Sequence, residues 1–398
     1  MLVIVAPGQG AQTPGFLRPW VEDPQFADRL DWLSAVAGLD LAHYGTDADA
    51  ETIRDTAIAQ PLLVASGLLA ALEVFPHPAD AFGRVGAVAG HSVGEIAAAA
   101  GARVITAEQA IVLVRERGKA MAAAAAVTPT GMSAVLGGDR EEVLAKLAQH
   151  GLTAANQNAP GQVVAAGTME QLAALADDPP AKARVRALQV AGAFHTEHMA
   201  PAVDTLAGYA RAVSTHDPRT RLLSNRDGQV VHDGREVLKR LVMQVRSPVR
   251  WDLCMQTMAD LGVTGMLEMP PAGTLTGIAK RALPDIETFA LKTPDQLDDV
   301  RAFVDKHGSA SPLDTSPTWR LLVAPAKGTF HASDGLEEGS RLGTGAGIGS
   351  VTSLRDSLPV VAPHGGTIVE WLVHDGDLVS PGQPLVRLHP EISTEVGA

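Results

Sequence analysis

The sequence predicts an α/β protein with a small all-β unit at its C-terminal end. Three observations support this fold class. Apolar stretches at residues 2–6 and 84–89 are typical of buried strands, and each runs into a loop punctuated by glycine, with helical sequence further along. Residues 126–190 have a different pattern of predicted elements, in the order strand–helix–strand–strand–helix–strand. Residues 323–330 resemble residues 361–368, which indicates an internal repeat of short strands.

Both predicted strands of the large domain end at loops suited to a functional site. The first leads into Pro7–Gln12, where glycines flank Gln9 and let the backbone approach a ligand closely. The second leads into Gly90–Gly94 and then a helix that starts near Glu95. We therefore expect an α/β-hydrolase-like parallel sheet, in which a strand, a sharp turn and a helix follow one another. Further helical sequence occurs around residues 60–75 and 107–125.

The segment 126–190 predicts an inserted ferredoxin-like subdomain. The large-domain pattern resumes with a helix after His195, so the module interrupts the main domain rather than following it. The expected strands of the module lie near 132–136, 152–155, 162–166 and 184–190, with helices at 140–149 and 168–176. Strands near 220–224 and 265–268 would extend the main sheet.

The C-terminal part predicts a separate domain. Residues 308–318 are rich in serine, proline and threonine, as linkers are, so we expect one domain at 1–307 and another at 319–398. The repeat within the second domain has an offset of 38 residues, and its two halves predict a small β-sandwich with pseudo-twofold symmetry.

Composition and charge exclude several classes of protein. The chain has 398 residues, 46% of them hydrophobic, and a mean hydropathy of +0.09, which is ordinary for a soluble globular protein. A net charge of −13 argues against nucleic acid as the main partner. We expect no membrane association, because no run approaches 18 apolar residues and the N-terminus lacks the basic region of a signal peptide. Cys254, the single cysteine, suits a reducing compartment, so we expect a cytoplasmic protein.

Ser92 is the first candidate for catalysis. It lies in a G-x-S-x-G pattern between a predicted strand and a predicted helix, the arrangement of a nucleophile elbow. Gly90 and Gly94 leave room for the turn, and the helix N-terminus behind Ser92 offers free N–H groups to a developing oxyanion. A plain structural turn is the alternative interpretation.

A nucleophilic serine needs a base, and the chain has 13 histidines. His91 is adjacent to Ser92 and poorly placed to turn back on it, so we interpret it as a structural part of the elbow. His195 follows the inserted module, where we expect a cleft between the subdomains. His198 is a second candidate, with a position on a helix surface as its alternative interpretation.

Seven sequence blocks together resemble the malonyl-CoA:acyl carrier protein transacylase family and the acyltransferase domains of polyketide synthases. Each block is weak alone, but the seven occur in the family's order over residues 1–305. They are Pro7–Gln12, Gly90–Gly94, Val114–Lys119, Asn158–Val164, Gly192–His195, Ser224–Asn225 and Gln244–Val249.

The resemblance implies a role for each of five residues. Ser92 would be acylated, with His195 as its base. The main-chain carbonyl of Gln244 would hold the imidazole in place of a third acidic side chain, which makes a dyad. The N–H groups of Gln9 and Val93 would form the oxyanion hole.

The resemblance also implies how the acyl group is selected. Arg117 would bind the free carboxylate of malonyl, since a guanidinium can make two parallel charge-assisted hydrogen bonds to a carboxylate. Phe194 would leave little space for the α-methyl group of methylmalonyl, which favours malonyl by about 10–200-fold. Where the family has a Glu-x-Gly-Pro-Gly block, this chain has Glu268-Met-Pro-Pro-Ala272. Proline fixes φ and removes a hydrogen-bond donor, so this loop cannot have the usual glycine geometry.

The C-terminal domain resembles the biotinyl/lipoyl-type barrel-sandwich hybrid. In that family a hairpin lysine lies seven residues before the second Ala-Pro pair; here that position holds Arg355. Arginine is not a substrate for amide attachment of a cofactor. With 5 Lys and Arg against 9 Asp and Glu, the domain is also not a nucleic-acid module. We expect it to bind an unidentified protein partner.

The sequence therefore predicts an enzyme that moves malonyl from malonyl-CoA to the phosphopantetheine thiol of an acyl carrier protein through a malonyl-serine intermediate. No metal or redox cofactor is implied. The carrier could serve fatty-acid or polyketide synthesis. Two alternatives stay open: a serine hydrolase of the lipase or esterase kind, which shares G-x-S-x-G, and an inactive acyltransferase-like scaffold.

Overall fold

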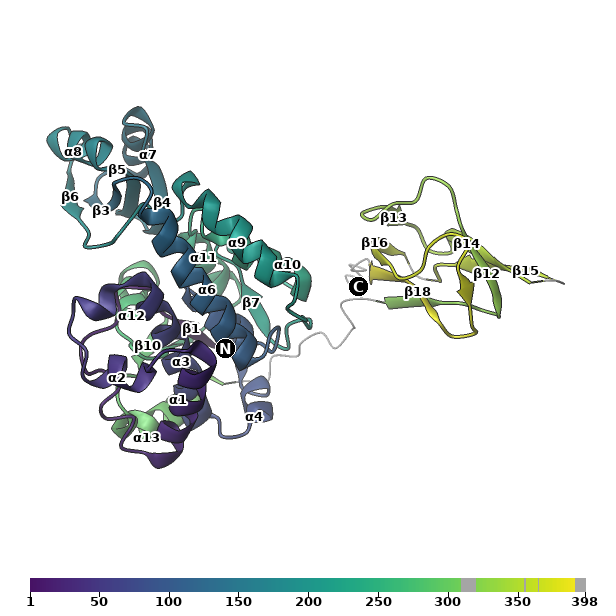
Figure 1. The fold of residues 1–398 in the computed structure, drawn as a ribbon, viewed down its shortest axis with the longest axis horizontal. Coiled ribbons are helices and arrows are strands. Elements are labelled where there is room, and N and C mark those ends of the chain that lie inside the picture. Colours follow the sequence, from purple (N-terminus) through teal and green to yellow (C-terminus); the bar gives the residue numbers. More distant parts are fainter. Residues whose placement is uncertain (309–319, 354–355, 364, 391–398) are drawn as a thin grey trace. The chain divides into compact units, whose positions relative to one another are not determined.

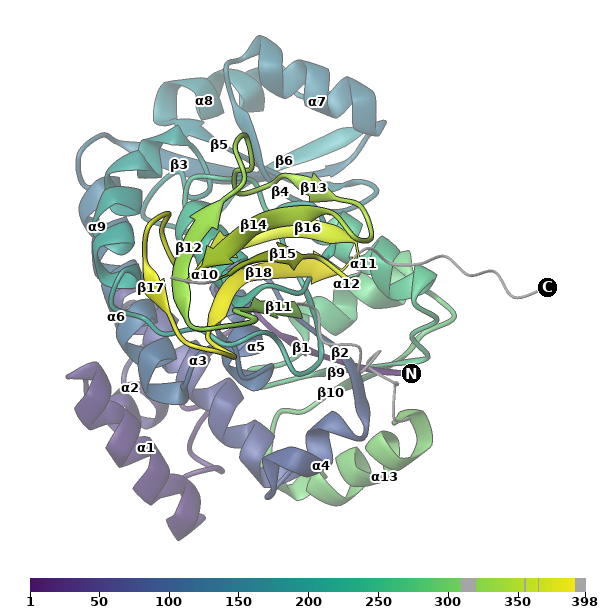
Figure 2. The ribbon, with the colours of Figure 1, turned by 90° about the vertical axis from the view of Figure 1, so that its right-hand side faces the viewer.

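The computed structural model describes residues 1–308, 320–353, 356–363 and 365–390, and the chain divides into two compact units (Figures 1 and 2). The first unit spans Met1–Leu313 and the second Asp314–Ala398. Apart from Gly308, the linker predicted at 308–318 lies outside the described residues, and so does Arg355.

The first unit is built on a six-stranded sheet with the strand order β10-β9-β1-β2-β7-β8. All neighbours are parallel except β8, which pairs antiparallel with β7. The strands are β1 (Leu2–Ala6), β2 (Val85–Gly90), β7 (Arg221–Leu223), β8 (Val230–Val231), β9 (Gly265–Glu268) and β10 (Glu287–Ala290). The predicted strands at 2–6, 84–89, 220–224 and 265–268 are thus confirmed within two residues, and they stand next to one another in one mainly parallel sheet.

Helices cover both faces of this sheet, which explains its continuous apolar strands. Successive residues of β1 point to opposite faces: Leu2 belongs to a core with α3, α5 and α6, whereas Val3 belongs to a core with α11 and α12. The helices are α1 (Pro24–Ala37), α2 (Leu41–Thr46), α3 (Thr56–Val74), α4 (Pro78–Phe82), α5 (Gly94–Gly101), α6 (Ala107–Ala125), α9 (Ala200–Ala210), α10 (Gly234–Gln244), α11 (Trp251–Asp260), α12 (Thr274–Ala282) and α13 (Leu297–His307). Short 3-10 turns lie at Thr52–Arg54, Glu197–Met199 and Pro294–Gln296.

Helix α3 corrects one expectation from the sequence. Among the described residues it is the one helix whose length and composition would allow it to cross a membrane, although we expected no segment of that kind. Most of the helix is buried inside the first unit, where it packs against α5 and α6. Its apolar character therefore has an explanation in the core of the protein.

The segment 130–187 forms its own antiparallel sheet with the order β4-β5-β3-β6. Its elements alternate as the sequence predicts: β3 (Thr130–Gly137), α7 (Arg140–Gln149), β4 (Thr153–Ala159), β5 (Gln162–Thr168), α8 (Met169–Asp177) and β6 (Ala183–Ala187). A separate cluster of buried residues, including Val135, Leu147 and Leu175, lies between this sheet and its two helices. The last strand ends three residues before the predicted residue 190.

The second unit consists of two four-stranded sheets, β11-β18-β16-β13 and β15-β14-β12-β17. The strands are β11 (Arg320–Val323), β12 (Gly328–Ala332), β13 (Arg341–Leu342), β14 (Gly347–Thr352), β15 (Ser357–Val361), β16 (Gly366–Trp371), β17 (Leu378–Val379) and β18 (Pro384–Pro390). When each of the first four strands is exchanged with its repeat partner four places on, one sheet becomes the other. The two halves of the second unit are therefore related by pseudo-twofold symmetry.

The matched positions of the repeat also share conformation and burial. Gly345 and Gly382 have φ of 80° and 78°. Phe330 and Ile368 are both buried in the core of the unit, at 0% and 1% exposure. The glycines supply the left-handed turns between short strands, and the apolar pairs fill the space between the sheets.

Candidate active site

Ser92 stands on a tight turn between β2 and α5. Its φ is 52°, a left-handed value that non-glycine residues seldom adopt. The two flanking glycines make this turn possible: a Cβ on Gly90 would overlap the backbone of Gly94, and a Cβ on Gly94 would overlap the carbonyl of Ala6. The strained turn holds the partly buried serine side chain at the carboxyl end of the parallel strands.

His195 lies against this serine. Its Nε2 is 2.8 Å from Ser92 Oγ, and its Nδ1 is 2.8 Å from the main-chain oxygen of Gln244. Because a carbonyl oxygen can only accept, Nδ1 carries the proton and Nε2 presents a lone pair to the serine hydroxyl. His195 also has a positive φ, 62°, and its N–H donates to the carbonyl of Val245. The sequence segment that returns from the inserted module thus meets the elbow of the main sheet.

The electrostatic surroundings keep the imidazole neutral. Burial lowers the pKa of His195 to about 3, and the positive charge of Arg117 acts in the same direction. A neutral imidazole is the form that can take a proton from a serine hydroxyl.

Arg117, on α6, is buried to 1% exposure next to this pair. Nη1 donates to Oε1 of Gln60 at 2.6 Å, and Nη2 donates to Oε1 of Gln244 at 2.9 Å. Nη2 also lies 3.4 Å from Ser92 Oγ. Nε has no hydrogen-bond partner, and within the described part of the chain no carboxylate forms an ion pair with this guanidinium. Burial lowers the pKa of Arg117 to about 10, so it stays a cation at neutral pH.

Three buried side chains to which the sequence analysis gave no role connect these groups. Besides Gln60, they are Glu95 and Asn225. Nε2 of Gln244 donates to the Glu95 carboxylate and, at 3.2 Å, to Oδ1 of Asn225. The same Oδ1 accepts from Ser92 N at 2.8 Å. Burial raises the pKa of Glu95 to about 7. A carboxylate in the otherwise apolar start of α5 was the one signal in the sequence that could have pointed to Glu95.

The residues predicted for the oxyanion hole have backbone amides without an acceptor among the described residues. Val93 is the N-cap of α5, so its N–H lies at the positive end of that helix. The side chain of Gln9 donates instead to Arg54 O and Thr56 Oγ1, which holds its loop in place. The same loop lies against the elbow, because a Cβ on Gly8 would come within 3.0 Å of the His91 carbonyl oxygen.

Phe194 and the two neighbouring histidines occupy different positions. The Phe194 ring is buried in the main core at 6% exposure, directly before His195 in the chain. Nε2 of His91 donates to Oδ1 of Asn158 at 2.8 Å, and the ring makes an edge contact with Trp251, which is consistent with a structural part in the elbow. His198 lies half-buried in a 3-10 turn, and in the described part of the chain no hydrogen bond joins its side chain to Ser92.

Comparison with known proteins identifies the family. The family model described as "Acyl transferase domain" matches residues 3–306, which is well over half of the chain. The chain belongs to the acyl transferase family. The match covers the main sheet, the inserted module and every candidate site residue, and it ends before the second unit.

Individual members of the acyl transferase family agree with this assignment. The malonyl CoA-acyl carrier protein transacylase of Mycobacterium tuberculosis is 54% identical over 300 residues, which cover 75% of this chain and 99% of the relative. A crystal structure of MCAT from the same organism has a TM-score of 0.73 and covers 76% of this chain and 99% of the solved one. A malonyl-transacylase solved in complex with a type II PKS acyl carrier protein is 28% identical, with a TM-score of 0.69 and coverages of 76% and 99%. The mixed fold of parallel and antiparallel sheets is therefore that of known transacylases.

Proposed function

We propose that this protein transfers the malonyl group of malonyl-CoA to the phosphopantetheine thiol of an acyl carrier protein. The observation that carries the proposal is the placement of Ser92 between a neutral imidazole, His195, and a buried guanidinium, Arg117, that has no carboxylate partner among the described residues. The names of the 54%-identical relatives support the same substrate pair.

In the first half-reaction, His195 Nε2 accepts the proton of Ser92 as Oγ bonds to the thioester carbonyl carbon. The carbon–sulfur bond then breaks, the coenzyme A sulfur takes the proton from His195, and malonyl stays on Ser92 as an ester. The Gln244 carbonyl holds the imidazolium that forms between these steps, since it accepts from Nδ1. No third acidic side chain is needed to orient the ring.

In the second half-reaction, the thiol of the carrier protein gives its proton to His195 and its sulfur bonds to the malonyl carbonyl carbon. The ester bond breaks, and Ser92 Oγ takes the proton back. In both halves the carbonyl oxygen becomes an oxyanion, which the free N–H groups of Gln9 and Val93 would stabilise. Each such donor contributes a factor of roughly 10²–10³ in rate. The sequence of steps uses protein groups alone and requires no metal or redox cofactor.

Arg117 would recognise the free carboxylate of malonyl, and Phe194 would limit the space at its α-carbon. Among the described residues, the charge of Glu95 acts on Arg117 from beyond ion-pair distance, and the malonyl carboxylate would be its direct partner. This feature favours acyl transfer of a dicarboxylic group over the hydrolysis of an uncharged ester, because a lipase or esterase has no use for a buried carboxylate-binding arginine. The intact Ser92–His195 pair likewise disfavours an inactive scaffold.

We also propose finer structural assignments and a setting. The main sheet is α/β-hydrolase-like and the module at about 126–190 is ferredoxin-like, which its strand order supports. The second unit is a barrel-sandwich hybrid, which the symmetry of its two sheets supports. The domains would be 1–307 and 319–398, and the enzyme would work in the cytoplasm, in keeping with its single, buried cysteine.

The second unit would serve as a docking module for an unidentified protein and carry no biotin or lipoyl group. The position of the modified lysine holds Arg355. Apolar side chains on the edge strands β11 and β15 are exposed, among them Val323 and Val361 at 45% each, and such side chains are typical of a binding surface. A mass spectrum of protein from its native host, with an added biotinyl or lipoyl group on residues 320–398, would overturn this assignment.

The central experiment is intact-protein mass measurement after incubation with malonyl-, methylmalonyl- or acetyl-CoA. We expect a malonyl adduct on the wild type, little methylmalonyl adduct, no adduct on Ser92→Ala and a severely slowed one on His195→Ala. His198→Ala is the matched control and should acylate normally. A malonyl adduct on Ser92→Ala at the wild-type rate would exclude the serine mechanism.

A further inference from the structure

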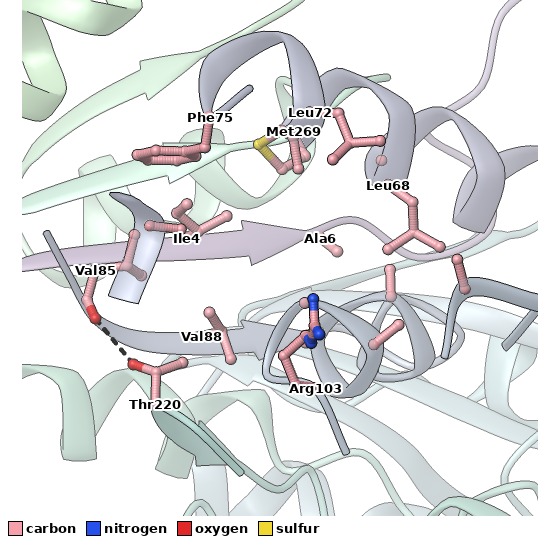
Figure 3. Close-up of a pocket in the computed structure, with 18 of the residues that line it drawn as sticks. Ile4, Ala6, Leu68, Leu72, Phe75, Val85, Val88, Arg103, Thr220 and Met269 are labelled. Atoms are coloured by element: carbon pink, nitrogen blue, oxygen red, sulfur yellow. Dashed lines mark hydrogen bonds between the residues drawn. The ribbon is translucent and has the colours of Figure 1, made fainter. Parts of the chain in front are cut away.

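A second site candidate lies behind the nucleophile helix, inside the first unit. An apolar cavity of about 450 Å³ opens between α3, the strands β1 and β2, and α5 (Figure 3). Figure 3 shows Leu68, Leu72 and Phe75 on the α3 side of the space, with Ile4 of β1 and Val88 of β2 facing them. Alanines of α5, Ala97, Ala98 and Ala100, complete the wall.

Small side chains are the reason that the space stays open. Gly67 of α3 is buried, yet a Cβ built on it would meet a single neighbouring atom within 4 Å, the Cβ of Ala97 at 4.0 Å. Buried positions in a close-packed core do not normally have such room. The cavity therefore exists because glycine and alanine occupy positions of this core where larger side chains would fit.

One end of the cavity carries a cation, Arg103, at the end of α5. Its φ is 66°, at a helix-terminating position where glycine is the usual residue. The backbone around it is fixed from both sides, because Arg219 N donates to Ala102 O and His216 N donates to Val104 O. The exposed guanidinium has no hydrogen bond or ion pair within the described ranges, and in Figure 3 it reaches toward the apolar lining. This guanidinium is therefore available to a ligand at the end of the cavity.

The other polar groups at this end are few. Glu108 and His216 also line the cavity and are exposed, and Glu108 does not pair with Arg103. The hydroxyl of Thr220 is used internally, since it donates to Val85 O at 2.9 Å. The lining thus offers a long apolar space with one available cationic group at its rim.

We propose that this cavity binds a free fatty acid of medium chain length, with the hydrocarbon chain inside and the carboxylate at Arg103. An apolar cavity of about 150 Å³ takes up a benzene ring, so three times that volume holds a chain of about ten carbon atoms. The head group stays in the aqueous rim beside the guanidinium, as charged groups do at apolar sites. The proposal does not depend on malonyl transfer, because it rests on a different set of residues.

The cavity and the turn that carries Ser92 share helix α5. The helix begins two residues after Ser92, ends two residues before Arg103, and forms one wall of the cavity. A bound chain fills the space behind the helix and stabilises the folded protein by mass action.

The test measures binding directly, by calorimetry and by the shift in Tm of the full chain. Decanoate should bind with a stoichiometry of one, raise Tm and compete with no acyl-CoA. Decanol, with the same chain and no charge, should bind about fivefold more weakly, the difference expected for an exposed ion pair. Equal binding of decanol and decanoate would remove Arg103 from the proposal, and no binding of either would overturn it.

Two variants and a control separate the chain from the head group. Gly67→Leu should fill the cavity, raise Tm in the absence of ligand and abolish decanoate binding. Arg103→Gln should lower decanoate affinity about fivefold and leave decanol unaffected. Arg186→Gln, an exposed arginine on β6, should change neither. Wild-type decanoate affinity in both Gly67→Leu and Arg103→Gln would show that the ligand binds elsewhere.

Discussion

Nη2 of Arg117 lies 3.4 Å from Oγ of Ser92, so the buried cation and the candidate nucleophile are direct neighbours before any substrate is bound. A malonyl ester on Ser92 would carry its free carboxylate one methylene beyond the carbonyl carbon, within reach of the same guanidinium. The hydrogen bonds from Arg117 to Gln60 and Gln244 hold that guanidinium in place. Arg117 would therefore select the acyl group directly beside the nucleophilic oxygen of Ser92.

Arg117→Ala should move the preference of the enzyme from malonyl toward acetyl. A charge-assisted hydrogen-bonded pair contributes about 1.5–3 kcal/mol, which corresponds to roughly one to two decades in discrimination. The measurement is the ratio of kcat/KM for malonyl-CoA and acetyl-CoA. Arg115→Ala is the matched control, since Arg115 stands on the same helix and pairs with Glu116 instead. If the ratio were the same in Arg117→Ala and wild type, Arg117 would have no part in carboxylate recognition.

The low pKa of His195 predicts a specific dependence of stability on pH. The folded-state pKa is about 3 and the ordinary value is 6.5, so between these values the unfolded chain binds more protons at this residue. The contribution is therefore fully present above pH 6.5 and is lost as pH falls toward 3, at a slope of roughly 1 kcal/mol per pH unit. Glu95 acts in the opposite sense: its raised pKa, about 7, contributes stability at low pH that is lost as pH rises from 4.5 to 7.

Denaturant unfolding of wild type and His195→Gln, from pH 4 to pH 7.5, separates the two groups. Glu95 is present in both proteins, so the difference between their unfolding free energies isolates His195. The wild type should lose stability relative to the variant as pH falls below 6.5. Parallel curves across the whole range would mean that the imidazole titrates normally in the folded protein.

The local sequence pattern was sufficient to predict the helices and strands that position the site. The strand at 2–6, the helix at 107–125 and the alternation within 126–190 were predictable, because period and glycine spacing are local properties. The pairing of Gln244 with Arg117 was not, since the two residues lie 127 positions apart and a glutamine carries no distinctive pattern. Gln60 was missed for the same reason, and Asn225 was named in a family block but given no role. Helix α3 shows the converse limit, because composition alone does not separate a core helix from one that crosses a membrane.

Glu95→Gln should weaken malonyl selection by loosening the orientation of Gln244. A carboxylate only accepts hydrogen bonds, so it holds Nε2 of Gln244 toward itself and turns Oε1 toward Arg117. A glutamine at position 95 can donate as well, which permits the Gln244 amide to reverse and present a donor to Arg117. We expect the malonyl-to-acetyl ratio at pH 8 to fall about tenfold in the variant, the cost of one hydrogen bond to a charged group.

The pH dependence of that ratio distinguishes orientation from simple loss of structure. In the wild type the ratio should rise between pH 6 and pH 8, because Glu95 loses its proton near pH 7. Glu95→Gln should remove this rise, while Glu108→Gln, an exposed carboxylate on α6, should keep it. A pH-independent ratio in the wild type would exclude the orienting role.

A shortened chain that ends at residue 308 should fold and form the malonyl-enzyme. The first unit has its own cores, and its last helix, α13, packs on β9 and α3 within that unit. The buried residues of the second unit form a separate cluster that includes Phe330 and Leu385. No buried cluster of the first unit contains a residue of the second unit. Each unit therefore keeps its own hydrophobic core when the other is removed. The rate of acylation by malonyl-CoA should match that of the full chain, and circular dichroism should show a folded protein that unfolds cooperatively. Insolubility or a slow acylation rate of the shortened chain would show that the second unit is an integral part of the catalytic fold.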